Sequence, residues 1–113
     1  MEISIKTYLY DILNSINEIE SYFIDSTRNF NDFVKDVKLK RAIERNLEII
    51  GEALNRINKL TPLVSITGFK QIIGLRNRII HDYDNVSSEL IWGIIIKHLP
   101  NLKKEIELLI NTY

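Results

Sequence analysis

The apolar residues of this chain recur every three or four positions over most of its length. This period is typical of amphipathic helices, because residues three and four apart lie on one face of an α-helix. Glycine and proline, which interrupt helices, are sparse, with 4 Gly and 2 Pro in 113 residues. The pattern therefore predicts an all-α fold. A first helix is expected from about Ile3 to Phe23 or Ile24, with an apolar stripe of Leu9, Ile12, Leu13, Ile16, Ile19 and Phe23.

Two further helices are expected in the first half of the chain. The polar run 25–29 offers several N-cap side chains and marks a turn. A short helix follows it, with inward positions Phe30, Phe33 and Val34. A third helix is expected from about Asp36, its N-cap, to Asn58 or Lys59. Its inward positions are predicted to be Leu39, Ala42 or Ile43, Leu47, Ile50, Leu54 and Ile57, with Lys40, Arg41, Glu44, Arg45 and Glu48 between them.

The third helix carries two small residues, Gly51 and Ala53, on either side of Glu52. A glycine in the middle of a helix costs about 1 kcal/mol relative to alanine. Close approach of another helix is therefore the expected reason for Gly51. Glu52 has two interpretations: an exposed carboxylate, which is the commoner case, or a buried partner for an arginine of the stretch Gly74 to Tyr83.

The second half predicts a loop and three more helical segments. Leu60 to Gly68 forms the loop, and a fourth helix begins near Thr67 or Gly68, with inward positions Phe69, Ile72, Ile73, Ile79 and Ile80. Ser87 is a good N-cap for a fifth helix, and Val86 and Ile91 are spaced for a hydrophobic staple. Pro100 fits a kink or the first turn of a final helix, whose inward positions are Leu102, Ile106, Leu109 and Ile110.

The run Leu90 to Ile96 is apolar on all sides. Periodicity alone does not distinguish a buried strand from a buried helix here, but the cap at Ser87 and the neighbouring helices favour a helix. A helix that is apolar all round must be covered on more than one side. We therefore predict a homodimer that covers part of the fourth and fifth helices; the alternative is that the run is the central helix of the chain's own core.

Length and composition narrow the class of protein. A chain of 113 residues is expected to form a single domain, 1–113. The absence of cysteine excludes disulfides and thiolate metal sites. His81 and His98 have no helix-spaced histidine partner, so neither a metal site nor a cofactor is predicted. No signal peptide and no membrane span are expected, which is compatible with a cytoplasmic protein.

The charge of the chain balances at 15 basic and 15 acidic residues, but it is unevenly distributed. Residues 36–81 carry nine basic and four acidic side chains. A basic centre suits an anionic ligand, although a solvated helix face rich in lysine has the same composition.

A candidate site lies at the end of the fourth helix. An arginine fork binds phosphate bidentately, and a histidine transfers protons near neutral pH, so Arg76 and His81 suit a nucleolytic site. Asn77 and His81 share a helix face, whereas Arg76 and His81 lie about 140° apart. Arg76 would reach the same place by its length, or if the helix loosens near His81. The alternative is a simple arrangement of charges at a helix C-terminus.

The run Leu75 to Tyr83, preceded by Asn46 to Ala53 and followed by Trp92 and Leu99-Pro100, resembles the HepT-like branch of the HEPN superfamily. The resemblance covers almost the whole chain. It implies an antiparallel bundle of about five to six helices that dimerises, and a metal-independent ribonuclease toxin of a toxin-antitoxin module.

The family pattern also assigns roles to residues of this chain. Arg76 and His81 correspond to its catalytic pair, and Asn77 to the polar residue that follows the arginine. Members pair with a minimal nucleotidyltransferase antitoxin that transfers AMP to a tyrosine, and Tyr83 occupies that position. Without the resemblance, Tyr83 would be interpreted as a half-buried aromatic residue closing the fourth helix.

The residue types suggest a mechanism, in which the 2′-hydroxyl of RNA attacks the adjacent phosphate. His81 would act as general base or acid, and Arg76 would stabilise charge on the phosphoryl group. A dimer would supply a second His81, and single-stranded RNA is the expected substrate. Two other functions remain open: a non-catalytic adaptor that binds a nucleotidyltransferase, and a helical structural dimer without a ligand.

Overall fold

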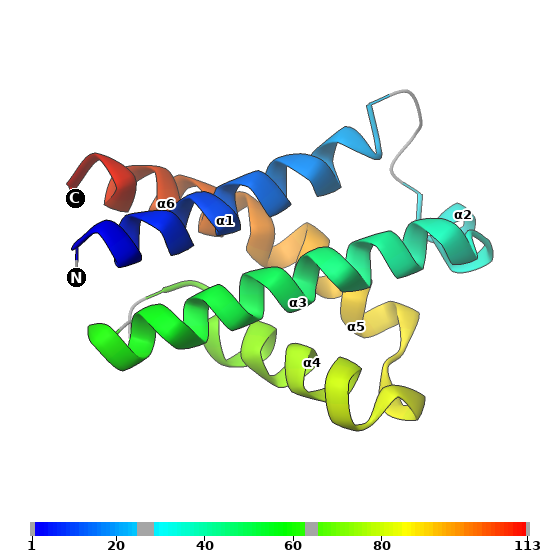
Figure 1. The fold of residues 1–113 in the computed structure, drawn as a ribbon. Helices are drawn as coiled ribbons and strands as arrows, with labels where there is room; N and C mark the ends of the chain where they lie inside the picture. Colours follow the sequence, from blue (N-terminus) through cyan, green and yellow to red (C-terminus); the bar gives the residue numbers. More distant parts are fainter. Residues whose placement is uncertain (1, 25–28, 63–65, 113) are drawn as a thin grey trace.

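The computed structural model describes residues 2–24, 29–62 and 66–112. Within these ranges the regular structure is entirely helical, as predicted (Figure 1). The described helices are α1 (Glu2–Ser21), α2 (Phe30–Lys35), α3 (Val37–Leu60), α4 (Phe69–His81), the 3-10 turn η1 (Tyr83–Asn85), α5 (Ser88–Gly93), the π-helical segment η2 (Ile94–His98) and α6 (Leu99–Thr112). Residues 25–28 of the predicted turn and residues 63–65 of the predicted loop lie outside the described residues.

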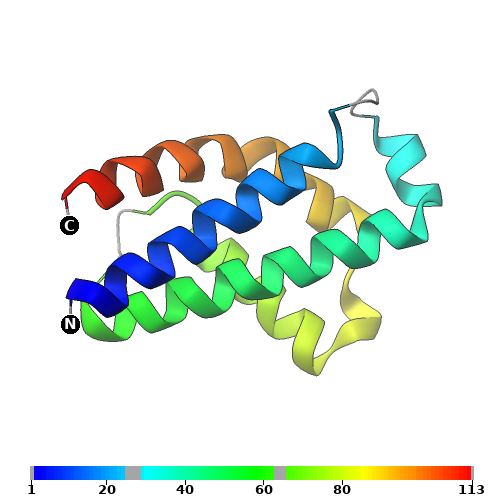
Figure 2. The same cartoon turned by 45° about the horizontal axis from the view of Figure 1, so that its top comes forward.

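The long helices form an antiparallel bundle, as expected. α1 packs against both α3 and α6, and α4 packs on α3. Figure 2 shows α1 between α6 and α3, with the two ends of the chain on the same side of the bundle. α4 lies on the other side of α3 and leads through η1 into α5. The run Leu75 to Tyr83, the motif at the end of α4, is therefore held against the middle and the N-terminal half of α3.

Side chains cap the helices where the sequence predicts. The Asp36 carboxylate accepts a hydrogen bond from the backbone N–H of Leu39 at 3.0 Å, and the Ser87 hydroxyl accepts one from Leu90 at 3.1 Å. Both bonds satisfy backbone groups that have no partner within the helix. They set the starts of α3 and α5, and so the direction in which each helix crosses its neighbours.

The core contains most of the residues expected to face inward. The predicted positions that are buried include Leu9, Ile12, Ile16, Ile19, Phe33, Ile43, Leu47, Ile50, Leu54, Ile57, Ile72, Ile79, Leu102, Ile106 and Ile110. Val34 and Ile80 are wrong predictions, because their side chains are 46% and 47% exposed. α2 has six residues and buries only Phe33, and Ile80 lies on a side of α4 that borders a surface pocket. Glu44, expected between the inward positions, is buried.

The apolar run in α5 and η2 is helical, and the chain itself covers most of it. Ile91, Ile94 and Ile95 are buried. The Trp92 ring packs against three phenylalanine rings, with centroid distances of 6.1 Å to Phe23, 5.9 Å to Phe30 and 5.3 Å to Phe33. Leu90 and Ile96 remain exposed. The predicted dimer is thus not needed to cover the whole run, and it stays a prediction.

Pro100 lies in the first turn of α6, as expected. Proline has no N–H to donate to the carbonyl one turn earlier. The helix reaches it through the π-helical segment η2, in which the hydrogen-bond pattern is already shifted. None of the described helices is both long and apolar enough to cross a bilayer.

Candidate functional site

Arg76 lies where α4 crosses α3. A Cβ built on Gly51 would lie 2.6 Å from the Cβ of Arg76 and 2.8 Å from its Cγ, which is closer than atoms of a real side chain come. Only glycine therefore allows α4 to approach α3 at this level. The close helix approach predicted for Gly51 is confirmed, and its neighbour across the contact is the predicted catalytic arginine.

The guanidinium of Arg76 is held by two side chains. Its Nη2 donates a hydrogen bond to Glu52 Oε2 on α3, and its Nη1 donates to Asn77 Oδ1 at 2.8 Å. The other Glu52 oxygen accepts from Arg56 Nε at 2.8 Å. Glu52 is thus a partner for Arg76, as its second interpretation predicted, but it is not a buried one, because its side chain is 40% exposed.

The electrostatics of this cluster favour the charged form of Glu52. The hydrogen bond from Arg56 is the main cause that lowers the pKa of the Glu52 carboxyl. Partial burial raises this pKa, and Arg76 lowers it further. One donor in the cluster remains unused: the Nε of Arg76 is buried and has no hydrogen-bond partner within the described part of the chain. Arg76 is therefore oriented without having all of its donors occupied.

A pocket of about 330 Å³ opens beside the guanidinium, between α1, α3 and α4. Its lining mixes charged and apolar side chains: Tyr8, Asp11, Glu48, Ile49, Glu52, Ala53, Arg56, Arg76 and Ile80. Glu52, Glu48 and Asp11 face two arginines here. The pocket borders the arginine on the side away from His81.

His81 is the last residue of α4 and is exposed. The helix stays regular up to it, since the backbone N–H of Asp82 donates to the carbonyl of Arg78 at 2.8 Å. The helix does not loosen near His81, and the guanidinium of Arg76 is directed to α3 instead. Asn77, which is also exposed, shares the face of His81. In the part of the chain that the structure describes, no hydrogen bond or ion pair joins the Arg76 guanidinium to His81.

Tyr83 lies in η1, two residues after His81. Its hydroxyl donates a hydrogen bond to Glu44 Oε1 at 3.1 Å, and the Arg41 guanidinium carbon lies 5.3 Å from the centre of its ring. The side chain is 41% exposed. Burial is the main cause that raises the pKa of the Tyr83 phenol; Glu44 adds to the increase and Arg41 opposes it. Tyr83 is thus both accessible and fixed in position.

Glu44 is the residue of this region that sequence reasoning missed. It is 4% exposed, and its Oε2 is buried without a hydrogen-bond partner among the described residues. Its position three residues before Leu47 puts it at the edge of the inward stripe of α3, which was the available signal. Nothing in the local sequence pairs it with Tyr83, 39 residues further along.

The motif offers three chemical groups: an oriented guanidinium, an accessible imidazole and a fixed phenol. The described residues contain no group of three or more histidine, cysteine, aspartate or glutamate side chains that could hold a metal ion.

Comparison with known proteins places this arrangement in a family. The family model described as ribonuclease HepT-like matches residues 12–109. A Methanocaldococcus jannaschii protein named as a candidate RNase is 36% identical over 105 residues, covering 92% of this chain and 94% of the relative. A second candidate RNase of the same organism is 40% identical over 108 residues, covering 91% of this chain and 84% of the relative.

A Thermococcus cleftensis protein named as a probable ribonuclease HepT is 36% identical over 110 residues, covering 95% of this chain and 96% of the relative. No solved structure matches the chain significantly. The match of the family model begins within α1 and ends within α6, and it includes the whole of α3, α4 and η1, which hold Arg76, His81 and Tyr83. This chain belongs to the ribonuclease HepT-like family.

Proposed function

We propose that this protein is a cytoplasmic, metal-independent endoribonuclease toxin of a toxin-antitoxin module, which cuts RNA with Arg76 and His81. The family and the names of its relatives support ribonuclease activity. The main observation in support of the proposal concerns two residues of α4. Glu52 and Asn77 orient the Arg76 guanidinium, and His81 is exposed to solvent on the same helix. These are the two groups that phosphate recognition and proton transfer need.

The reaction needs only the substrate and these side chains. His81 removes the proton of the 2′-hydroxyl, and the 2′-oxygen attacks the adjacent phosphorus. The bond to the 5′-oxygen breaks, and this leaving oxygen takes up a proton, so that the products are a 2′,3′-cyclic phosphate and a 5′-hydroxyl. Arg76 stabilises the extra negative charge on the phosphoryl oxygens as the bond forms.

A homodimer supplies what one chain lacks. One histidine serves poorly as base and acid in the same step, and Arg76 and His81 lie on different sides of α4. A second copy that brings its own His81 to the same cleft provides the second proton-transfer group, and brings a guanidinium within reach of a phosphate held by the first copy. Dimerisation is therefore part of the proposed mechanism.

Tyr83 is the proposed control point. A minimal nucleotidyltransferase antitoxin would transfer AMP to its hydroxyl. The side chain is 41% exposed, and the hydroxyl would leave its hydrogen bond to Glu44 in order to react. The attached phosphate would stand two residues from His81, where its charge and bulk compete with the phosphate of RNA. Modification at this position would thus stop cleavage without removing either catalytic side chain.

One observation favours a different function. The Arg76 guanidinium already has a carboxylate partner in Glu52, and among the described residues no hydrogen bond or ion pair joins it to His81. A protein that only binds a nucleotidyltransferase, and is modified by it, would not need the two groups to meet. The second candidate is therefore a non-catalytic adaptor that presents Tyr83 to the partner enzyme.

Cleavage of several RNA classes in the presence of EDTA separates the two candidates. The unmodified parent is expected to cut RNA, and Arg76→Ala and His81→Ala variants that remain folded and dimeric are expected to lose the activity. Tyr83→Phe is the matched control, which keeps both catalytic groups and should cut. If a folded, unmodified parent cuts none of the RNAs, the ribonuclease proposal is wrong and the adaptor is left.

The modification is tested separately by mass spectrometry after incubation with ATP and a purified minimal nucleotidyltransferase. Addition of AMP to the parent and none to Tyr83→Phe is the expected result. An unmodified parent, or a variant that gains as much AMP as the parent, would contradict the assignment of Tyr83.

A further inference from the structure

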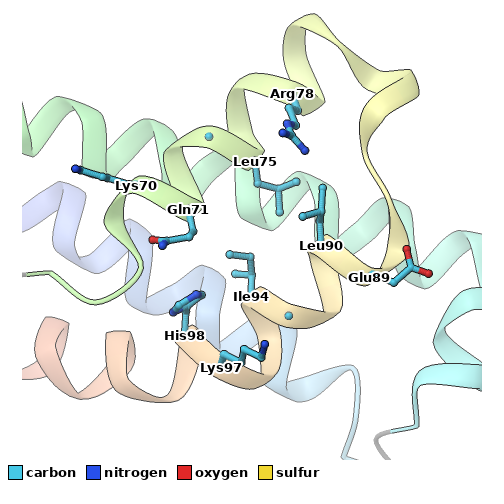
Figure 3. Close-up of a pocket in the computed structure, with 11 residues that line it drawn as sticks. Lys70, Gln71, Leu75, Arg78, Glu89, Leu90, Ile94, Lys97 and His98 are labelled. Carbon is cyan, nitrogen blue, oxygen red and sulfur yellow. The ribbon is translucent and has the colours of Figure 1, made fainter.

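A second groove, separate from the pocket beside Arg76, lies between α4 and the α5–η2 segment (Figure 3). It has a volume of about 400 Å³. Its apolar lining consists of the exposed Leu90 and the edges of two core residues, Leu75 and Ile94, which are 5% and 6% exposed. Figure 3 shows these three side chains directed toward one another across the gap, with Arg78 above them and His98 and Lys97 below. The groove therefore combines an apolar floor with polar side chains around it.

The rim of the groove is basic. Lys70 and Arg78 on α4 and Lys97 on η2 line it, with Glu89 as the one acidic residue among the lining side chains. In the part of the chain that the structure describes, the ion pairs involve other residues, so these three cations are not neutralised by a carboxylate. These unpaired basic side chains gather at the groove although the chain as a whole has equal numbers of basic and acidic residues, 15 of each. The groove is complementary to an anionic ligand.

Gly74 and Gly93 line the groove, and the packing of the chain does not require glycine at either position. A Cβ on Gly74 or Gly93 would meet nothing within 4 Å. Both lie inside helical segments, where glycine costs about 1 kcal/mol relative to alanine, so neither the backbone nor the packing of this chain explains them. They leave open space on both walls of the groove. The second wall also contains the π-helical turn η2, a local structure that occurs frequently at functional sites.

His81 does not line the groove, but it follows the lining residues of α4 along the helix. His81 follows Arg78 by three residues and Gly74 by seven, and these spacings place the three residues on neighbouring parts of one face of α4. A ligand lying along the groove reaches His81 without crossing a helix. The pocket beside Arg76 lies on the other side of α4 and has no such continuity.

We propose that this groove binds the stretch of single-stranded RNA that flanks the cleaved bond, with phosphates on Lys70, Arg78 and Lys97 and a base against Leu75, Leu90 and Ile94. A single strand offers both parts of the required ligand, because its backbone is anionic and its base faces are free to pack on an apolar surface. This inference rests on the proposed ribonuclease function and extends it to the seating of the substrate.

The test measures the affinity for a fluorescein-labelled homouridine strand by anisotropy, in a His81→Ala background that does not cut the probe. Neutralising the rim with Lys70→Gln, Arg78→Gln and Lys97→Gln is expected to weaken binding roughly fivefold per lost contact at about 0.1 M salt, and to reduce the slope of log affinity against log salt by about 0.7 per contact. Lys38→Gln with Lys59→Gln is the control, since both lysines are exposed on α3 and do not line the groove.

A second variant fills the groove without changing its charge. Gly93→Leu projects a side chain into the open space, so it is expected to retain its folding stability and lose affinity for RNA. Unchanged affinity in both the rim variants and Gly93→Leu would overturn the inference, provided that the parent cuts RNA. If the rim and Gly93→Leu variants instead change the oligomeric state, measured by light scattering, and bind RNA like the parent, the groove is an interface between copies. A parent that neither binds nor cuts RNA would refute the proposed function together with this inference.

Discussion

Arg76 crosses Gly51 so closely that no methyl group fits between them, since a Cβ on Gly51 would lie 2.6 Å from the Cβ of Arg76. The atoms in conflict belong to the base of the arginine side chain, which moves only if α4 moves. The placement of the guanidinium and the packing of two helices therefore depend on one missing carbon atom.

Gly51→Ala is expected to destabilise the protein and to reduce RNA cleavage. The clash should cost up to about 3 kcal/mol against a gain of about 1 kcal/mol in helix propensity, so the net loss should be up to about 2 kcal/mol. Urea unfolding measures the change. Gly74→Ala is the matched control, because its Cβ meets nothing within 4 Å and the variant should be stabilised by up to about 1 kcal/mol. Equal stability changes in the two variants would contradict the close contact.

The hydrogen bond between Tyr83 and Glu44 is expected to contribute to stability. Tyr83→Phe removes the donor from a carboxylate that is 4% exposed, and should cost about 1–3 kcal/mol. The double variant Tyr83→Phe with Glu44→Leu should lose less than the sum of the single changes, which a double-mutant cycle measures. Tyr10→Phe, at a 45% exposed tyrosine, is the control and should change stability by less than about 0.5 kcal/mol. Additive single changes would show that the two residues do not interact.

Glu52 makes stability depend on pH in the acid range. Because the pKa of its carboxyl is lowered in the folded protein from the ordinary value of 4.5, its contribution is fully present above that value and is lost as the pH falls through the folded pKa. Melting temperatures of the parent and of Glu52→Gln should therefore differ near neutral pH, and the difference should shrink as the pH falls below 4.5 and through the folded pKa. A difference that stays constant down to acid pH would refute the role of this carboxylate.

Arg76→Lys tests whether the shape of the guanidinium matters beyond its charge. The guanidinium donates to Glu52 and Asn77 with two different nitrogens, whereas an ammonium is a point charge without this fork. The rate of RNA cleavage is expected to fall by about a hundredfold. Arg45→Lys, an exposed arginine on α3 away from the pocket, should cut at the parent rate. An Arg76→Lys variant as active as the parent would mean that charge alone suffices.

The features that could be predicted from the sequence are those that depend on residues within a single helix. The caps at Asp36 and Ser87 and the close approach at Gly51 each leave a local sign, a capping side chain or a costly glycine. The exposure of Ile80 left no such sign, because a helical stripe marks apolar residues without showing where the neighbouring helix ends. The pairs Arg76–Glu52 and Tyr83–Glu44 join residues 24 and 39 positions apart, so they depend on how α4 crosses α3.

Because Glu44 is buried, chemical substitution of the Tyr83 hydroxyl would affect the position of η1. Any substituent on the phenol oxygen removes the only hydrogen that reaches this carboxylate in the described structure, whose second oxygen already has no partner. A buried carboxylate without any donor is costly, and a substituent on the phenol oxygen, unlike the ring of Tyr83→Phe, would also need space beside that carboxylate, so the substituted tyrosine would favour release of η1 from α3. Chemical change at one oxygen atom would then be converted into displacement of the turn that follows His81, and the substituted and unsubstituted proteins would differ in shape as well as in charge.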